Sequence, residues 1–221
     1  SKNAASVGGT SIYLRPGEVF TVEDLLWGAL LNSGNDSCVA LAEAVAGSES
    51  LFIQMMNKKA LLVGAYDTTF KNTNGLPKDG HLSTAYDLAK MADYALDNPV
   101  FAAIVRTKEA EIPKKDTAWR RNLNNTNRLL SSYKGADGVK TGTTNAAGQC
   151  LVASATRNGR QLIAVVLKSA NRYQDAVKIL NHGFEDFTLY KIPRGTVVGT
   201  LYCGKAKPYQ VDLVTQEDLC F

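Results

Sequence analysis

Residues Gly138–Thr144 read Gly-Val-Lys-Thr-Gly-Thr-Thr, and the chain that follows them predicts the surrounding fold. Gln149 to Arg157 has the composition of a β-strand, and Asn158-Gly159 is typical of a two-residue hairpin turn. Arg160 to Leu167 predicts the returning strand, so three strands follow one another closely. The returning strand is apolar at nearly every position from Leu162 to Leu167. We therefore expect it at the sheet centre, covered on both faces, with the Lys-Thr-Gly strand nearer an edge.

The side chains at the middle of this stretch suit an extended peptide that ends in a carboxylate. Lys140 supplies a positive charge, and Thr141 can donate a hydrogen bond to the carboxylate. Gly142 has no side chain, so a ligand backbone can lie flat against the strand. The alternative is a surface strand with a tight turn, because this tripeptide alone is only suggestive. A phosphate-binding loop is excluded, since Val139 stands where that motif requires glycine.

The bulk properties favour one full domain and part of a second. With 221 residues, 45% of them hydrophobic, the chain can bury one sizeable core. The formal charge of +4 comes from 25 basic and 21 acidic residues without a polybasic run, so nucleic acid is not an expected partner. No apolar run reaches the length of a membrane span, and no signal segment opens the chain.

The cysteines and histidines do not have the spacing of a zinc site, and we expect neither a metal nor a cofactor. Cys38 and Cys150 fall in apolar segments and are predicted to be core thiols. Cys203 and Cys220 could form a disulfide, which the sequence leaves open. His81 lies just before a predicted helix start and is expected to be structural.

Most of the first hundred residues are predicted to be helical. Capping signals at Thr21, Ser48 and Thr84 each predict a helix start. A further helix is expected to begin near Asn35-Asp36, either of which can cap it. The methionines of the third helix, Met55 and Met56, are predicted to fill the core. No helical periodicity is present from Ser1 to Tyr13.

Ser33 and Asn35 lie in the tight connection between two of these helices. Short polar side chains in such a connection can point into a cleft instead of along a helix face. The alternative is that both residues merely cap the following helix.

The second half of the sequence predicts mainly strands, together with one more long helix. Lys108 to Ile112 and Thr117 to Arg121 predict a two-stranded ribbon around residues 113–116. A helix is expected from Asn171 or Arg172 through Phe184, with Phe187 extending it. Thr196 to Cys203 and Tyr209 to Val214 then predict the strands of a β-rich module.

Several stretches, taken in chain order, resemble the low-molecular-weight penicillin-binding proteins and, more narrowly, the serine-type D-alanyl-D-alanine carboxypeptidases. The stretches are Ser33-Gly34-Asn35, Asn72-Thr73-Asn74-Gly75-Leu76, Gly80-His81-Leu82-Ser83-Thr84-Ala85, Asn125-Thr126-Asn127, Asp137-Gly138-Val139-Lys140-Thr141-Gly142-Thr143 and Ala147-Gly148. The resemblance implies an α+β fold of the β-lactamase/transpeptidase type, with an antiparallel sheet flanked by helices. We expect this domain over residues 1–191 and the start of a small β-rich C-terminal domain over 192–221.

The family uses three motifs, Ser-x-x-Lys, Ser-x-Asn and Lys-Thr-Gly. The second corresponds to Ser33–Asn35 and the third to Lys140–Gly142. The first, which supplies the nucleophilic serine, has one match at Ser131–Lys134. That match lies between the other two motifs, so we interpret Ser131 as a loop residue. We expect the chain to begin downstream of the nucleophile, and to be inactive alone. The Glu-x-x-Leu-Asn segment of class A β-lactamases is also missing.

The resemblance implies acyl transfer through a serine nucleophile, with a catalytic role for Ser33, Asn35 and Lys140. Ser33 would relay the proton to the leaving amine, and Asn35 would hold the catalytic lysine and the substrate amide. Lys140 would keep that lysine neutral and attract the substrate carboxylate. Thr141 would bind the carboxylate beside Gly142, and the Thr143 N–H would donate into the oxyanion hole.

The implied substrate is the D-Ala-D-Ala end of a peptidoglycan stem peptide, and β-lactam antibiotics are the implied inhibitors. The implied location is extracytoplasmic, in the periplasm or on the outer face of the cytoplasmic membrane. The segment that carries the nucleophile could remain bound as a separate fragment. The alternative function is a non-catalytic peptidoglycan-binding or regulatory protein that keeps the groove without the nucleophile.

Overall fold

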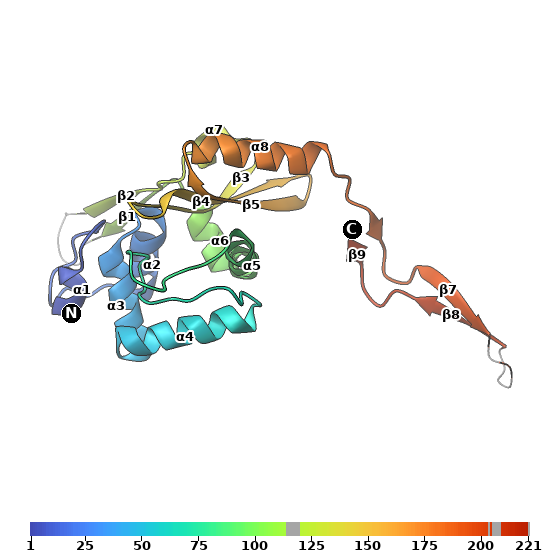
Figure 1. The fold of residues 1–221 in the computed structure, drawn as a ribbon, viewed down its shortest axis with the longest axis horizontal. Helices are drawn as coiled ribbons and strands as arrows, with labels where there is room; N and C mark the ends of the chain where they lie inside the picture. Colours follow the sequence, from blue (N-terminus) through green and yellow to red (C-terminus); the bar gives the residue numbers. More distant parts are fainter. Residues whose placement is uncertain (114–119, 203, 205–208, 221) are drawn as a thin grey trace. The chain divides into compact units, whose positions relative to one another are not determined.

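The computed structural model describes residues 1–113, 120–202, 204 and 209–220 (Figure 1). The chain forms two compact units, Ser1–Asn181 and His182–Phe221, which divide within α8 (Arg172–Glu185). The sequence predicts a domain boundary at 191–192, and that assignment stays a prediction. The first unit contains every residue that the sequence predicts for the site.

The predicted helix starts at Thr21, Ser48 and Thr84 are confirmed, because each hydroxyl accepts a backbone N–H of the first turn. At Thr21 the capping box is complete, since the Asp24 carboxylate accepts the Thr21 N–H in return. The N-terminal half of the chain contains one helix after Gly34 and, in addition, α1 (Lys2–Ser6), α2 (Val22–Leu31), α4 (Glu49–Leu62), α5 (Ala85–Leu96) and α6 (Pro99–Arg106). The short α1 lies where the sequence predicts no helix.

The helix that follows Ser33, α3 (Asn35–Ala46), begins differently from the prediction. Its N-cap is Gly34, and both Asn35 and Asp36 lie inside the first turn, so neither side chain caps the helix. A Cβ built on Gly34 would lie 3.2 Å from the carbonyl oxygen of Gly28 in α2. Glycine therefore permits the close crossing of α2 and α3 at this connection.

The prediction that the α4 methionines fill the core is wrong for Met55, which is 50% exposed. Ala60 is the one residue of α4 that is fully buried among the described residues. The apolar side chains of α4 extend around more of the helix than the stripe that packs on the rest of the unit. Helical periodicity identifies α4 but does not identify the width of its buried face.

The central sheet contains β3 (Ala136–Thr144), β4 (Gly148–Arg157) and β5 (Arg160–Ser169) in the order β3-β4-β5, all antiparallel. The predicted hairpin at Asn158-Gly159 is confirmed. Both turn residues have positive φ values, 53° and 76°, which a two-residue turn of this kind requires. The position of β3 at an edge is also confirmed.

The prediction that Leu162–Leu167 is the sheet centre is wrong for the described residues, because β4 lies between β3 and β5. β5 is apolar because its faces are largely covered, with Ala164 and Val166 buried and α5 packed against it. An apolar sequence indicates what lies above and below a strand. It does not indicate which strands lie beside it.

Helices cover both faces of this sheet. Figure 1 shows α5 and α6 beneath it, with α7 (Leu129–Ser132) and the first part of α8 above it. Buried side chains lie at these contacts, among them Leu151, Ala153 and Ala164 of the sheet and Leu180 of α8. The α+β architecture that the sequence predicts, an antiparallel sheet flanked by helices, is therefore confirmed.

A two-stranded ribbon lies beside this core. β1 (Glu109–Pro113) pairs antiparallel with β2 (Arg120–Asn124), so the predicted ribbon is confirmed, although β1 begins one residue later and β2 ends three residues later than predicted. The predicted turn at 114–116 and the predicted strand residues 117–119 lie outside the described residues. Ile112 and Leu123 bury their side chains in a cluster with Ile12, Leu31 and Ile104. The ribbon is thus attached to the end of α2, directly before Ser33.

The second unit consists of short strand pairs. β6 (Lys191–Ile192) pairs with β9 (Leu219–Cys220), and β7 (Val197–Tyr202) pairs with β8 (Gln210–Val214). The two predicted strands of this region are confirmed within a residue or so. Phe187 follows the end of α8 and does not extend it. A disulfide between Cys203 and Cys220 cannot be placed, because Cys203 lies outside the described residues.

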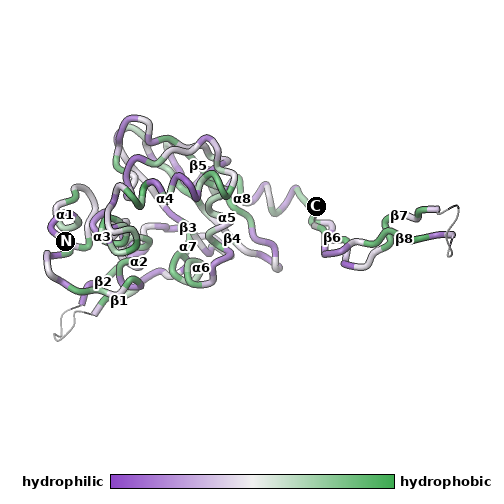
Figure 2. Tube along the Cα trace, turned by 90° about the horizontal axis from the view of Figure 1, so that it is seen from below, coloured by the Kyte–Doolittle hydropathy of each residue, from purple (hydrophilic) through white to green (hydrophobic). Residues whose placement is uncertain are grey.

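Hydrophobic and hydrophilic segments alternate along the coloured part of the tube in Figure 2. Within the described ranges, no single helix is long and apolar enough to cross a membrane. α3 and α4 reach that length and hydropathy only together, and they are bent by 87° relative to each other.

Candidate active site

Lys140 and Ser33 meet across the first unit. The ammonium group of Lys140, on edge strand β3, donates a hydrogen bond to the hydroxyl of Ser33, between α2 and α3. It also donates to the carbonyl oxygen of Thr141, at 3.1 Å. Two residues that are 107 positions apart in the chain therefore form one hydrogen-bonded pair.

Backbone conformation and a buried carboxylate fix the Ser33 connection. Ser33 has φ 59°, a left-handed conformation that serine seldom adopts. Asp36, 1% exposed, accepts hydrogen bonds from the Ser11 hydroxyl at 2.7 Å and from the backbone N–H groups of Ile12 and Leu14 at 3.1 and 2.9 Å. Asp36 thereby holds the N-terminal loop against the start of α3. Sequence reasoning considered Asp36 only as a helix cap.

Asn35 is buried and faces the same N-terminal loop. Its side-chain amide donates to the carbonyl oxygen of Gly8 at 2.7 Å, and its backbone N–H donates to Thr10 at 2.8 Å. A Cβ built on Gly9 would lie 2.6 Å from this amide, so the loop approaches Asn35 where only glycine fits. The structure therefore places Asn35 at the start of α3, two residues after Ser33, with its amide nitrogen directed to the loop.

The remaining predicted residues follow Lys140 along β3. Thr141 is 9% exposed, and its hydroxyl lies 2.5 Å from the hydroxyl of Thr126, either of which can be the donor. A Cβ built on Gly142 would meet no atom within 4 Å, so this position is open. The Thr143 hydroxyl accepts a hydrogen bond from Arg172.

Arg172 is a residue of the site that the sequence predicted only as a possible helix start. Its guanidinium, at the start of α8, donates to the Gly142 carbonyl at 2.9 Å, to the Thr143 hydroxyl at 2.8 Å and to the Cys150 carbonyl at 3.2 Å. The group therefore adds a second positive charge beside Lys140 and holds the end of β3. The only sequence signal was an arginine directly after an apolar strand.

The electrostatics of the site bring the pKa of Lys140 close to neutral pH. Burial lowers the pKa of Lys140 to about 8, and the positive charge of Arg172 acts in the same direction. Burial raises the pKa of the nearby Cys38 thiol to about 11. At pH 7 the lysine is therefore mostly cationic and the thiol is neutral. Of Lys140 and Cys38, only Lys140 can change its charge near neutral pH.

Hydrogen bonds to the Asp137 carboxylate hold the beginning of β3, the strand that carries Lys140. Asp137 accepts hydrogen bonds from the Ser154 hydroxyl at 2.6 Å, from the Thr156 hydroxyl, and from the Gln161 amide at 3.0 Å. These three residues lie on β4 and β5, so one side chain joins all three strands. Asn127 donates to the adjacent Gly138 carbonyl at 2.7 Å. The strand that carries Lys140 is thus fixed at its beginning as well as at its end.

The other sequence candidates lie away from this pair. Ser131 is exposed and lies within the short helix α7, so the prediction that it is a loop residue is wrong. His81 accepts a hydrogen bond from the Lys71 N–H through Nδ1, as expected for a structural histidine. Cys38 and Cys150 are free thiols, and both are only partly buried. Among the described residues, no group of three His, Cys, Asp or Glu side chains could hold a metal ion.

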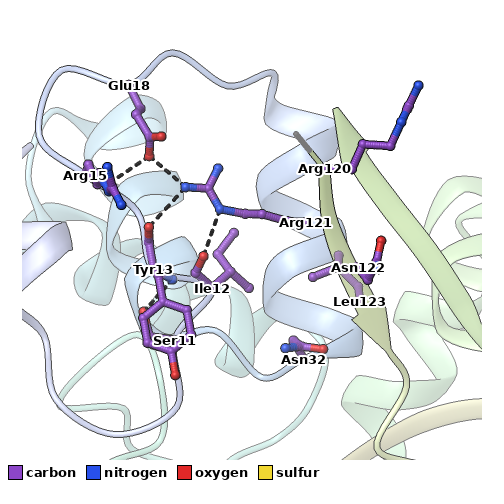
Figure 3. Close-up of a pocket in the computed structure, with 10 residues that line it drawn as sticks. All are labelled: Ser11, Ile12, Tyr13, Arg15, Glu18, Asn32, Arg120, Arg121, Asn122 and Leu123. Atoms are coloured by element: carbon purple, nitrogen blue, oxygen red, sulfur yellow. Dashed lines mark hydrogen bonds and ion pairs between the residues drawn. The ribbon is translucent and has the colours of Figure 1, made fainter. Parts of the chain in front are cut away.

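A separate cavity of about 460 Å³ lies between the N-terminal loop and β2 (Figure 3). A buried ion pair forms part of its wall, since Arg121 donates to Glu18 at 2.8 Å and to the carbonyl oxygens of Ile12 and Tyr13. Asn32, which also lines it, directly precedes Ser33. None of the predicted site residues lines this cavity, so it is distinct from the Ser33–Lys140 pair.

The fold and the site define the class of penicillin-binding, transpeptidase-like proteins. A family model described as D-alanyl-D-alanine carboxypeptidase, Peptidase S11, matches residues 1–171. The chain belongs to this family of low-molecular-weight penicillin-binding proteins.

Curated relatives agree with this family. The chain is 40% identical over 225 residues to D-alanyl-D-alanine carboxypeptidase DacF of Bacillus subtilis, covering 99% of this chain and 57% of the relative. It is 42% identical over 190 residues to DacC of Escherichia coli, covering 84% of this chain and 46% of that protein. The chain thus spans about half the length of the curated relatives that it matches.

Solved structures agree with the fold. The DD-transpeptidase of Streptomyces K15 has a TM-score of 0.74 and 38% identity over 80% of this chain and 72% of that one. The carboxypeptidase DacD of Francisella tularensis has a TM-score of 0.84 and 26% identity over all of this chain and 67% of that one. The predicted transpeptidase-like fold is therefore confirmed.

Proposed function

We propose that this chain forms most of the active site of a serine-type D-Ala-D-Ala carboxypeptidase that trims peptidoglycan stem peptides. The hydrogen bond between Lys140 and Ser33 supports this most directly. It joins the Lys-Thr-Gly and Ser-x-Asn motifs at one place, which acyl transfer by this family requires. The nucleophilic serine is proposed to come from a part of the longer protein outside residues 1–221.

In the proposed reaction, the serine oxygen attacks the carbonyl carbon of the penultimate D-alanine, while the lysine of the Ser-x-x-Lys motif takes the serine proton. The C–N bond then breaks, and the terminal D-alanine leaves as a free amine that takes a proton relayed through the Ser33 hydroxyl. Water hydrolyses the serine ester, which releases the shortened peptide and restores the nucleophile. This relay needs a hydroxyl that can both donate and accept a hydrogen bond, and the Ser33 hydroxyl has both capacities.

The substrate carboxylate is proposed to lie along the open side of β3. Lys140 and Arg172 supply positive charge there, and the Thr141 hydroxyl supplies a donor. The unobstructed Gly142 leaves room for the peptide backbone. The Thr143 N–H is proposed to donate to the oxyanion, a contact whose loss typically lowers turnover about a hundredfold to a thousandfold.

β-Lactam antibiotics are proposed to inhibit the enzyme by acylating the same serine. Because the substrate belongs to the cell wall, we also propose that the protein acts outside the cytoplasm. Asn35 is proposed to contact the substrate amide through its side-chain oxygen, since its amide nitrogen is directed to Gly8.

The test uses the full-length gene product and a fluorescent penicillin. Covalent labelling, together with release of D-alanine from a peptide ending in D-Ala-D-Ala, is the expected result. A Ser33→Ala variant should lose most of both activities while it keeps its melting temperature. A Ser131→Ala variant is the matched control and should behave as the parent does.

The alternative, a non-catalytic peptidoglycan-binding protein, predicts a different outcome. The full-length product would bind the peptide reversibly, but neither penicillin nor peptide would form a covalent adduct. The residues encoded upstream of Ser1 discriminate the two cases directly, because a Ser-x-x-Lys motif there favours the enzyme.

A further inference from the structure

The segment Asn125-Thr126-Asn127 belongs to the sequence pattern of the site, but the proposed reaction assigns it no role. Its two asparagines have structural partners. Asn125 donates to the carbonyl oxygens of Val105 and Thr107 at 3.2 and 2.9 Å, and Asn127 donates to Gly138 at 2.7 Å. The segment is therefore fixed between α6 and β3, with Thr126 at its centre.

The backbone of Thr126 is held on both sides. Its N–H donates to the carbonyl oxygen of Leu31 at 3.3 Å, two residues before Ser33. Its carbonyl oxygen accepts the Tyr173 hydroxyl at 2.9 Å, from the first turn of α8. Thr126 therefore lies where the ends of α2, β3 and α8 meet, and its hydroxyl remains for one further contact.

That contact is the 2.5 Å hydrogen bond to the hydroxyl of Thr141. Each hydroxyl has one proton to donate and two lone pairs that accept. If Thr141 gives its proton to Thr126, it has none for a carboxylate. If Thr126 is the donor, the proton of Thr141 stays available for a substrate, and the donated bond polarises it further.

We propose that Thr126 is a positioning residue for substrate recognition, which donates to Thr141 and thereby directs the Thr141 proton to the terminal carboxylate of the peptide. Thr126 acts through Thr141 and takes no part in the bond changes. This inference rests on the proposed function, because it assumes that Thr141 binds that carboxylate. It assigns to Thr126 a role in affinity for carboxylate substrates and none in the acylation step itself.

The experiment compares Thr126→Val with Thr126→Ser in the full-length gene product. Valine keeps the shape of threonine and removes the hydroxyl, whereas serine keeps the hydroxyl. With a peptide ending in D-Ala-D-Ala, Thr126→Val should raise KM about tenfold and change kcat by less than about twofold. Thr126→Ser should restore the parent KM, and Thr107→Val, whose hydroxyl donates to Ala103, is the matched control.

Two further measurements separate positioning from a general structural effect. With the methyl ester of the same peptide, which has no terminal carboxylate, Thr126→Val should change kcat/KM by less than about twofold. In a Thr141→Val background, adding Thr126→Val should have no further effect, because its partner is gone.

Each outcome decides the inference. An unchanged KM in Thr126→Val, additive effects with Thr141→Val, or an equal loss on ester and acid would overturn it. The inference would also be overturned if Thr126→Val failed to fold and Thr126→Ser were inactive. In that case the hydroxyl, which Thr126→Ser keeps, would not be the relevant group. If the parent protein itself neither releases D-alanine nor binds penicillin covalently, the proposed function fails. If the parent is active and Thr126→Val has the parent KM, only the inference about Thr126 fails.

Discussion

The ammonium group of Lys140 donates a hydrogen bond to the hydroxyl of Ser33, although strand β3 and the α2–α3 connection are far apart in the chain. Burial lowers the pKa of this lysine, and Arg172 adds a like charge nearby. The pair therefore combines a proton-relaying hydroxyl with a cation whose charge can change near neutral pH. The first three predictions test this combination.

Removing the Lys140 charge should abolish most of the acylation. In the full-length protein, Lys140→Met should lower the rate of labelling by a fluorescent penicillin about a hundredfold to a thousandfold, because it removes a charge-assisted hydrogen bond in the site. Lys134→Met, at an exposed position before β3, is the control. Comparable labelling rates in the two variants would contradict the assignment of Lys140.

The activity should depend on pH through Lys140. Its pKa of about 8 means that the cation is present below pH 8 and is lost above it. The kcat/KM for a carboxylate-terminated peptide should therefore decline as the pH rises through about 8. In Lys140→Arg, whose guanidinium keeps its charge to above about pH 12, this decline should disappear. A parent profile that is flat from pH 7 to 9.5 would exclude Lys140 as the titrating group.

Arg172 should affect both the affinity and this pH profile. Arg172→Leu removes the hydrogen bonds to Gly142 and Thr143, so KM for the peptide should rise about tenfold to a hundredfold. Loss of the like charge should also raise the pKa of Lys140 and move the decline to higher pH. Arg106→Leu, on exposed α6 surface, serves as the comparison. If both variants keep the parent profile, Arg172 has no electrostatic role in the site.

Asp36 should be important for stability. Asp36→Ala would leave the buried N–H groups of Ile12 and Leu14 without their acceptor, which typically costs about 2–4 kcal/mol in the free energy of unfolding. Urea denaturation of the full-length protein measures this value. Asp93→Ala, at an exposed position on α5, should change it by less than about 0.5 kcal/mol. Equal midpoints for the two variants would be incompatible with the network described above.

The Cys38 thiol should resist alkylation in the native protein. With a pKa of about 11, roughly one molecule in a thousand is the reactive thiolate at pH 8. Iodoacetamide should therefore modify Cys38 at least about a hundredfold more slowly in the native protein than in urea. Peptide mass mapping identifies the modified cysteine, and Cys38→Ser provides the control. Rapid native modification would mean that the pKa of the Cys38 thiol is not raised.

Features that depend on neighbouring residues in the chain were predictable from the sequence. The caps at Thr21, Ser48 and Thr84 and the turn at Asn158-Gly159 each follow from the local chemistry of a few residues, and all four are present. The place of β5 at an edge of the sheet formed by the described residues was not predictable, because no local signal states which strand lies beside another.

The same distinction applies to the site. Ser33, Asn35 and Lys140 were selected through an ordered set of motifs, and their catalytic roles stay predictions. Asp36 and Thr126 gain their importance from partners more than ten positions away. Thr126 lies in one of the recognised stretches, but that stretch did not indicate its contact with Thr141. Arg172 was visible as a charge after a strand, but its three acceptors belong to two other strands.

The left-handed backbone of Ser33 restricts which residues evolution can place there. Threonine is the other aliphatic side chain with a hydroxyl, and its chemistry would suit proton relay equally well. Its branched Cβ, however, is crowded against the backbone when φ is positive, so the exchange would weaken the fold while it preserved the reactive group. Selection at this position therefore acts on chain geometry as well as on chemistry.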